Sequence, residues 1–268
     1  GDVYRDRGDY MRLHTKLFNF HEETYKVNIH LPEDTQDAYP LLVVLDGERY
    51  ENLFVDMINL FGPVSDYTCI YPYAVVTISL PKLGNNRARF YNATRHHEHY
   101  HLIEKLKTAS YEYGGAEQFQ QFLENDILQY VNEKIKVNHK KKVIFGHSLT
   151  GLYLLHQIST HPSVFTDYII MSPSVWWNNR EALQYDYSQL KEHSCKVWFS
   201  AGELEGDLTG DILLLEEKLP SSNTTVKIFK DENHSSIVHT SIHSAFRYVY
   251  DKMDYATYVE KHRSKVKR

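Results

Sequence analysis

The sequence predicts an α/β fold in which a mostly parallel central sheet is covered by helices on both faces. Short apolar runs typical of buried strands alternate with longer amphipathic segments, and this alternation is the pattern of such sheets. The chain has 268 residues, of which 42% are hydrophobic, enough to bury one large core. We therefore expect a single domain over residues 1–268, with its core at about residues 25–250.

The elements expected from apolar periodicity follow one another in the order of such a fold. The predicted strands are residues 25–31, 41–45, 74–79, 142–145, 168–171, 196–201 and 225–229. The predicted helices are residues 51–61, 116–135, one from the end of the fourth strand to 160, and a last one over 238–249. Ligands in sheets of this kind bind outside the carboxyl ends of the strands, so a site is expected in the loops there.

Residues 80–115 show no clear periodicity and are rich in Tyr, His, Arg and Asn. A loop that long inside a compact domain is usually a lid or a binding loop. It contains the run His96-His97-Glu98-His99-Tyr100-His101, which suggests a metal site. Alternating histidines on a loop seldom close a coordination shell without ligands from elsewhere, so we expect no metal and favour a substrate-facing or pH-sensitive loop.

Ser148 lies between a buried-looking strand and an apolar helix, in the segment Phe145-Gly146-His147-Ser148-Leu149-Thr150-Gly151. A tight strand-to-helix turn exposes a serine hydroxyl beside the free N–H groups of the helix start, which can stabilise an oxyanion. The usual pattern is Gly-x-Ser-x-Gly. Here Thr150 takes the fifth place and the glycine follows at Gly151, so we expect either a slightly opened turn or smaller neighbouring side chains, with activity reduced rather than abolished.

The partners that a nucleophilic serine needs follow it in the chain order acid, then histidine. A turn with three carboxylates, Glu203, Glu205 and Asp207, comes after the strand at 196–201. His234 lies on a polar loop after the strand at 225–229, as a general base should. The residues alone leave the choice of acid open, and Glu205 ranks first because it lies on the loop itself and has the reach of a glutamate.

Several separate motifs resemble one family. They are Leu45-Asp46-Gly47-Glu48-Arg49-Tyr50, Asn86-Arg87-Ala88-Arg89, Gly114-Gly115-Ala116-Glu117-Gln118-Phe119, Ser172-Pro173-Ser174-Val175-Trp176-Trp177, and Asn233-His234. Over about residues 25–250 the chain resembles the putative-esterase branch of the α/β-hydrolases, and within it the enterochelin-esterase-like serine hydrolases that open siderophore trilactones. It departs from the family pattern at Thr150 and in residues 90–95 after the second arginine.

The resemblance implies an α/β-hydrolase fold and supports Glu205 as the acid. The expected oxyanion donors are the N–H of Leu149 and one N–H from the loop around Glu48. Arg87 and Arg89 correspond to the Arg-x-Arg segment of the family, and from this resemblance they are expected to hold an anionic substrate.

Three aromatic residues complete the predicted substrate site. Of Trp176 and Trp177, one is expected to pack in the core and the other to stack on a substrate. Tyr50, at the end of the Leu-Asp-Gly loop, is a further candidate for substrate binding.

The expected function is a serine esterase that forms an acyl-enzyme on Ser148, acting on a siderophore-type or other anionic or aromatic ester. No metal or organic cofactor is expected. An acyltransferase or thioesterase on the same fold, and a catalytically weak binding module, remain alternatives.

Charge and cysteine content exclude some partners. Thirty basic side chains against 35 acidic ones imply no basic surface for nucleic acid, and no apolar run approaches membrane-spanning length.

Cys69 and Cys195 are expected to be free thiols. The lysine-rich residues 140–142 are expected to form a solvated strand entry, and residues 261–268 are expected to form a tail. Oligomeric state and compartment stay open: the chain starts at Gly1, so a soluble cytoplasmic protein or, after loss of a leader, a periplasmic or secreted one is expected.

Overall fold

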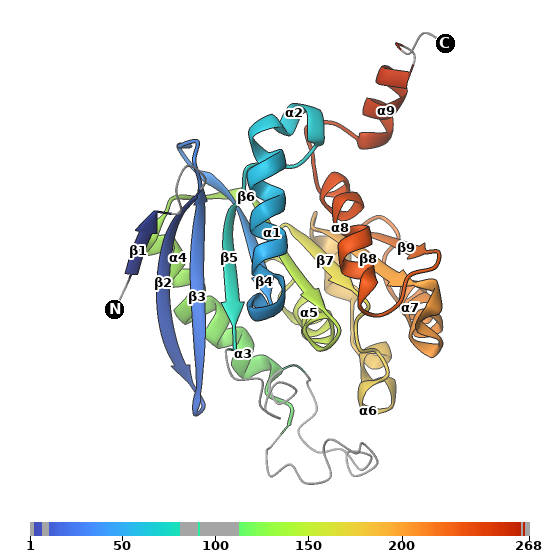
Figure 1. The fold of residues 1–268 in the computed structure, drawn as a ribbon. Coiled ribbons are helices and arrows are strands. Elements are labelled where there is room, and N and C mark those ends of the chain that lie inside the picture. Colours follow the sequence, from blue (N-terminus) through green and yellow to red (C-terminus); the bar gives the residue numbers. More distant parts are fainter. Residues whose placement is uncertain (1–2, 7–10, 81–90, 92–112, 264, 266–268) are drawn as a thin grey trace.

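The computed structural model describes residues 3–6, 11–80, 91, 113–263 and 265, and their strands form one sheet (Figure 1). The strands are β1 (Val3–Asp6), β2 (Met11–Phe20), β3 (Glu23–Pro32), β4 (Tyr39–Leu45), β5 (Ala74–Ser79), β6 (Val137–His147), β7 (Asp167–Met171), β8 (Lys196–Gly202) and β9 (Thr224–Phe229). Their order in the sheet is β1-β2-β3-β5-β4-β6-β7-β8-β9. The neighbours from β5 to β9 are parallel, which confirms the predicted mostly parallel sheet.

Helices cover both faces of this sheet, as predicted (Figure 1). On one face lie α1 (Gly47–Phe61) and α8 (Ser236–Tyr248). The other face carries α3 (Ala116–Phe122), a π-helical stretch (Leu123–Leu128) continuing into α4 (Gln129–Lys134), then α5 (Leu149–Thr160) and α7 (Asp207–Lys218). Shorter helices are α2 (Ser65–Thr68) and α6 (Trp177–Arg180), and α9 (Tyr255–Arg263) projects beyond α8 without a buried residue.

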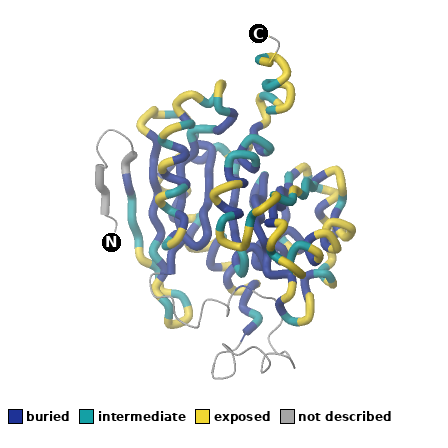
Figure 2. The backbone as a smooth tube through the Cα atoms, turned by 45° about the vertical axis from the view of Figure 1, so that its right-hand side comes forward, coloured by how far each residue is buried: buried dark blue, intermediate teal, exposed yellow. Residues whose placement is uncertain are grey.

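The alternation of side chains along the central strands divides the core into two layers. In β4, Leu41, Val43 and Leu45 pack toward α3 and α5, whereas Leu42 and Val44 pack toward α1 and α8. All seven residues of β4 are buried, because parallel strands covered on both faces have no solvent side. The central strands are accordingly dark blue and the outer helix surfaces yellow in Figure 2.

The structure contains elements that periodicity did not predict. β1 and β2 were not predicted. Together with β3, which was expected as the strand 25–31, they form an antiparallel extension at one edge of the sheet, and β3 pairs antiparallel with β5. β2 shows partly exposed residues without strict alternation, so its sequence lacks the apolar run of a buried strand. α7 was also not predicted: it begins directly after Gly206, where the acidic sequence indicated a turn.

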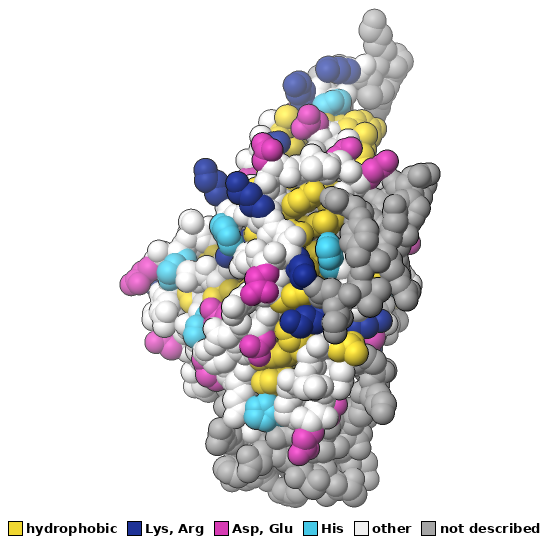
Figure 3. Space-filling model, turned by 90° about the vertical axis from the view of Figure 1, so that its left-hand side faces the viewer, with side chains coloured by type: hydrophobic (Ala, Val, Ile, Leu, Met, Phe, Trp, Pro, Cys, Tyr) yellow, Lys and Arg dark blue, Asp and Glu magenta, His cyan; other side chains and the backbone are white. Residues whose placement is uncertain are grey.

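Three further predictions concern charge, thiols and membranes. On the face seen in Figure 3, cations and carboxylates are interspersed, in keeping with the formal net charge of −5. Cys69 and Cys195 are buried free thiols, as predicted. Within the described part of the chain, no helix combines the length and the apolar character needed to cross a bilayer.

Lys141 departs from the prediction of a solvated strand entry. Its side chain is buried, and Nζ lies 2.9 Å from Oδ2 of the buried Asp167 and 2.7 Å from the carbonyl oxygen of Val249. Burial lowers the pKa of Lys141, and the charge of Asp167 opposes that shift. The pair therefore ties β6 and β7 to the end of α8, at the opposite end of these strands from Ser148.

Replacing Lys141 should destabilise the fold without affecting the site. Lys141→Met leaves the Asp167 carboxylate buried without its cation, which we expect to reduce the free energy of unfolding by about 3–5 kcal/mol. Denaturant unfolding measures this loss, with Lys140→Met at the exposed neighbouring position as the control. Similar losses in both variants would contradict a specific role for the buried pair.

Candidate active site

Three side chains from separate strand ends meet at one edge of the sheet. Ser148 follows β6, Glu205 ends the 3₁₀ turn Glu203–Glu205 after β8, and His234 lies in the loop between β9 and α8. His234 Nε2 is 3.1 Å from Ser148 Oγ, and His234 Nδ1 is 2.6 Å from Glu205 Oε1. The three predicted residues are therefore brought together in the arrangement of a serine, a base and an orienting carboxylate.

The turn at Ser148 has the backbone strain of a nucleophile elbow. Ser148 adopts φ 61° and ψ −116°, a conformation that non-glycine residues rarely take. A Cβ on Gly146 would lie 2.8 Å from the carbonyl oxygen of Thr150, and one on Gly151 would lie 3.0 Å from Cα of Pro173. Glycine at both positions lets the strand, the helix and the following strand end approach closely enough to hold this turn.

Thr150 is accommodated by specific hydrogen bonds. Its buried hydroxyl accepts the N–H of His147 at 2.9 Å and donates to Oδ2 of Asp46 at 2.9 Å. The close contact that requires a glycine falls one residue later, at Gly151. The threonine therefore links the elbow to the start of α1, where Asp46 itself adopts φ 55°.

Glu205 is held by three donors. Its Oε2 accepts the Ser172 hydroxyl at 2.7 Å and the Gly202 N–H at 2.5 Å, while Oε1 faces His234. Burial opposes ionisation, but the hydrogen bonds from His234, Gly202 and Ser172 together lower the pKa of Glu205. The carboxylate is thus kept charged and oriented toward the imidazole.

The other two candidate carboxylates lie elsewhere. Glu203 Oε1 accepts the N–H of Asp231 at 3.3 Å, and Asp207 is the first residue of α7. A Cβ on Gly202 would lie 2.1 Å from the carbonyl oxygen of Glu232 in the histidine loop. The absence of a side chain there lets the two loops touch and brings Glu205 within reach of the base.

The predicted oxyanion donors both lie at helix starts. Leu149 is the first residue of α5, and Glu48 is the second residue of α1. Backbone N–H groups in a first helical turn have no partner within the helix and point toward an incoming anion. The Glu48 carboxylate accepts the N–H of Leu80 at 3.2 Å. The expected oxyanion donor is therefore the backbone N–H of Glu48, and that role stays a prediction.

Tyr50 is largely buried, and its role in substrate binding stays a prediction. Its side chain is 8% exposed and packs edge-on against Phe145. Its hydroxyl is 3.0 Å from Nδ1 of His147, a buried residue that the sequence motif did not single out. The contact joins α1 to the end of β6. It forms because α1 follows β4, which lies beside β6 in the sheet and ends at the same edge.

The two tryptophans divide as expected between core and surface. Trp177 is buried, whereas Trp176 is 45% exposed. Trp176 lines a cavity of about 640 Å³ beside His234, together with Leu204, Glu205, Asp207, Leu208, Asp211, Asn233 and Ser235. Trp176 is therefore the tryptophan that can contact a bound molecule.

Other predicted contacts lie outside the described residues. These are Arg87, Arg89 and the histidines of residues 96–101.

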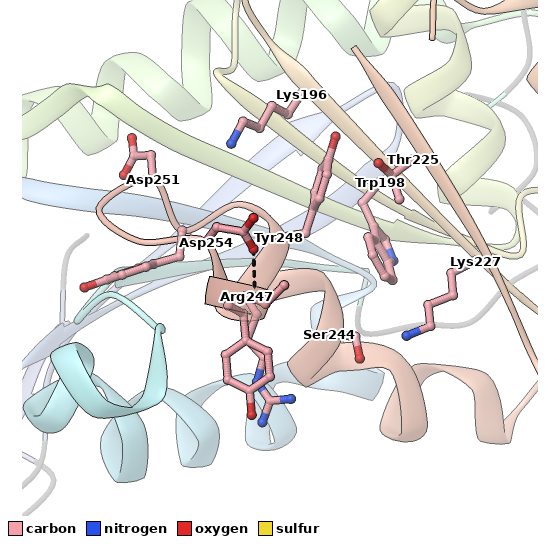
Figure 4. A pocket seen from close by; sticks show the side chains of 12 residues that line it. Lys196, Trp198, Thr225, Lys227, Ser244, Arg247, Tyr248, Asp251 and Asp254 are labelled. Atoms are coloured by element: carbon pink, nitrogen blue, oxygen red, sulfur yellow. Dashed lines mark hydrogen bonds between the residues drawn. The ribbon is translucent and has the colours of Figure 1, made fainter. Parts of the chain in front are cut away.

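A second cavity, of about 720 Å³, lies at the far end of β8 and β9, between Trp198, Lys227, Arg247 and Tyr248 (Figure 4). Its described lining residues include Ser244 but no histidine, so this cavity holds no serine–histidine pair.

Ser172 and Ser174 join the site through contacts that sequence reasoning did not identify. Ser174 Oγ lies 3.3 Å from Ser148 Oγ, and the N–H of Ser174 donates to the carbonyl oxygen of Ser148 at 3.1 Å. Both serines follow β7, between the strands that carry Ser148 and Glu205. Their place at a carboxyl strand end was the signal that could have found them.

Known proteins share this fold and sequence pattern. The chain is 27% identical over 196 residues to the ferri-bacillibactin esterase BesA of Bacillus subtilis, covering 68% of this chain and 66% of that protein. It is 35% identical over 106 residues to a siderophore triacetylfusarinine C esterase of Aspergillus fumigatus, covering 39% and 34%. The chain thus matches slightly less than two thirds of BesA and about a third of the fungal esterase.

Solved structures and a family model extend the likeness to most of the chain. The BES protein from Bacillus cereus superposes with a TM-score of 0.79 at 24% identity, over 89% of this chain and 96% of that one. The siderophore hydrolase EstA from Aspergillus nidulans gives a TM-score of 0.70 at 18% identity, over 89% and 94%. The predicted α/β-hydrolase fold is confirmed. A family model described as putative esterase matches residues 19–245, and the chain belongs to this putative esterase family.

Proposed function

We propose that this chain is a serine esterase that hydrolyses carboxylic esters through an acyl-enzyme on Ser148. The observation that carries the proposal is the pair of contacts from His234, 3.1 Å to Ser148 Oγ and 2.6 Å to Glu205 Oε1. A serine hydroxyl is a weak nucleophile unless a base accepts its proton, and this geometry supplies the base and the group that orients it.

In the first half of the reaction, Ser148 Oγ attacks the ester carbonyl carbon while its proton passes to His234 Nε2. Glu205 stabilises the imidazolium through Nδ1–H. The negative charge on the tetrahedral oxygen is met by N–H groups at the starts of α5 and α1. The imidazolium then gives its proton to the leaving alkoxide, which departs as the alcohol.

In the second half, a water molecule takes the place of the alcohol. His234 accepts a proton from the water as its oxygen attacks the acyl carbon. Collapse of the second tetrahedral intermediate returns this proton to Ser148 Oγ and releases the acid. A thiol or alcohol acceptor in place of water would make the same site a transferase, and product analysis with added acceptors distinguishes the two.

The substrate proposed is a siderophore-type ester with an aromatic acyl group. The relatives named above are a ferri-bacillibactin esterase and a siderophore triacetylfusarinine C esterase, which supports a siderophore-type ester. The cavity beside His234 offers an exposed aromatic face on Trp176 and an apolar surface on Leu204, which is 62% exposed. Exposed apolar side chains in the cavity that His234 lines favour an aromatic ligand.

Loss of the nucleophile should abolish turnover while leaving the fold intact. We expect Ser148→Ala to reduce kcat on an aryl ester by at least ~10³-fold, and to prevent labelling by a fluorophosphonate. The exposed Ser163, far from the site, provides Ser163→Ala as the control. A Ser148→Ala variant retaining more than about a tenth of the rate would show that another group is the nucleophile.

Loss of the orienting carboxylate should be less severe. We expect Glu205→Gln to lower kcat by roughly 10²-fold, because the serine and base remain but the imidazole loses its anionic partner. Glu203→Gln and Asp207→Asn are matched variants whose kcat should stay near that of the wild type. A near-normal Glu205→Gln variant would rule out this carboxylate as the triad acid.

Arg87 and Arg89 were assigned to substrate binding from the sequence. If Arg87 and Arg89 hold negative charge on the substrate, changing both to Gln should raise KM for an anionic ester. A neutral short-chain ester should be hydrolysed nearly as before. Equal changes in KM for the two esters would remove the idea of anion binding.

A further inference from the structure

A second histidine stands directly behind the proposed base. His147, the last residue of β6, is buried, and its ring centre lies 4.7 Å from that of His234. His147 Nε2 is 2.8 Å from the backbone carbonyl oxygen of His234, and its Nδ1 is 3.0 Å from Tyr50 Oη. A chain of contacts thus runs from α1 through the end of β6 to the loop that carries the base.

The partners determine which nitrogen of His147 carries the proton. A carbonyl oxygen can only accept, so Nε2 must be the N–H that donates to it. Nδ1 is then the unprotonated nitrogen and accepts the Tyr50 hydroxyl. The His234 carbonyl therefore sets the tautomer, and the Tyr50 hydroxyl supports it by donating to the unprotonated Nδ1.

We propose that His147 and Tyr50 are positioning residues, which fix the backbone of His234 so that its ring stays aligned with Ser148. The proposal rests on the proposed function of Ser148 and His234. With it, His234 is held at two points: its carbonyl by His147, and its ring Nδ1 by Glu205 at 2.6 Å. Asn233 braces the same loop through hydrogen bonds with Ser235 and Ser236, and His147 adds the contact to the His234 carbonyl itself.

The environment of His147 keeps it neutral when His234 becomes protonated. Burial, followed by the charge of His234, lowers the pKa of His147 to about 4, while Asp46 and Glu205 oppose the shift. The facing groups are therefore His234, Asp46, Glu205 and the Tyr50 hydroxyl. A neutral ring at this position donates its hydrogen bond without adding a second positive charge beside the imidazolium.

Substitutions of His147 separate the hydrogen bond from the shape of the ring. His147→Phe keeps an aromatic ring but removes the donor, and we expect kcat to fall by ~10- to 100-fold with KM little changed. His147→Gln places an amide N–H near the position of Nε2 and should recover most of that loss. Equal losses in the Phe and Gln variants would overturn the proposal.

Removing the Tyr50 hydroxyl tests the role of this tyrosine while its ring is kept. Tyr50→Phe should lower kcat, because Nδ1 loses its donor and the ring can adopt the tautomer that no longer donates to His234. Tyr168→Phe is the matched control, since its hydroxyl is also buried but bonds to the carbonyl oxygen of Pro162, away from the site. A Tyr50→Phe variant with the kcat of the control would contradict the role of the tyrosine.

Two further measurements do not require the natural substrate, and the first of them uses only the wild type. Nitrogen NMR of the wild type should show His147 as the Nε2–H tautomer at neutral pH, and an Nδ1–H tautomer would overturn the proposal. The rate of labelling by a fluorophosphonate should fall in His147→Phe and return in His147→Gln. A wild type that is not labelled would instead contradict the proposed serine esterase itself, so the two failures are distinguishable.

Titration of stability adds a pH readout. The pKa of His147 is lower in the folded chain than its ordinary value, so between about pH 6.5 and pH 4 the unfolded chain binds a proton that the folded chain does not. Wild-type stability should therefore decrease as the pH is lowered from about 6.5 to 4, and His147→Gln should make this decrease smaller. An unchanged pH dependence in the Gln variant would show that His147 is not held neutral.

Discussion

The close approach of backbone segments at the carboxyl ends of β6, β7 and β8 is the constraint on which the rest of the site depends. Added Cβ atoms on Gly146, Gly151 and Gly202 would fall 2.8, 3.0 and 2.1 Å from neighbouring backbone atoms. These glycines allow Ser148 to keep a strained backbone and allow the histidine loop to rest on the loop of Glu205. A side chain at any of them would separate groups that must lie within hydrogen-bond reach.

The parallel sheet turns this local crowding into the proposed catalytic arrangement. β6, β7 and β8 are neighbours and end at the same edge, so Ser148, Ser172 and Glu205 emerge side by side although they are far apart in the chain. His234 comes from β9, the next strand along. The opposite strand ends carry the buried pair of Lys141 and Asp167, so stability and chemistry occupy different edges of the same sheet.

Several features were predictable because they depend on short stretches of sequence. Buried parallel strands read as continuous apolar runs, and glycine beside serine before an apolar helix indicated the elbow at Ser148. β2 lacked such a signal, since most of its described side chains, at residues 13–20, are partly or fully exposed. α7 was hidden by its acidic first turn at Asp207, which is favourable at a helix start but also typical of a loop.

The sequence by itself determined the order of the central strands and of most helices that cover them, the serine at a strand-to-helix turn, and a histidine and carboxylates after later strands, because these are local properties of the chain. Only the tertiary structure decided that Glu205 meets His234, that Thr150 bonds to Asp46, and that Tyr50 lies against His147. Each of these contacts joins residues at least 29 positions apart. Their geometry depends on how whole strands pair, which no local pattern encodes.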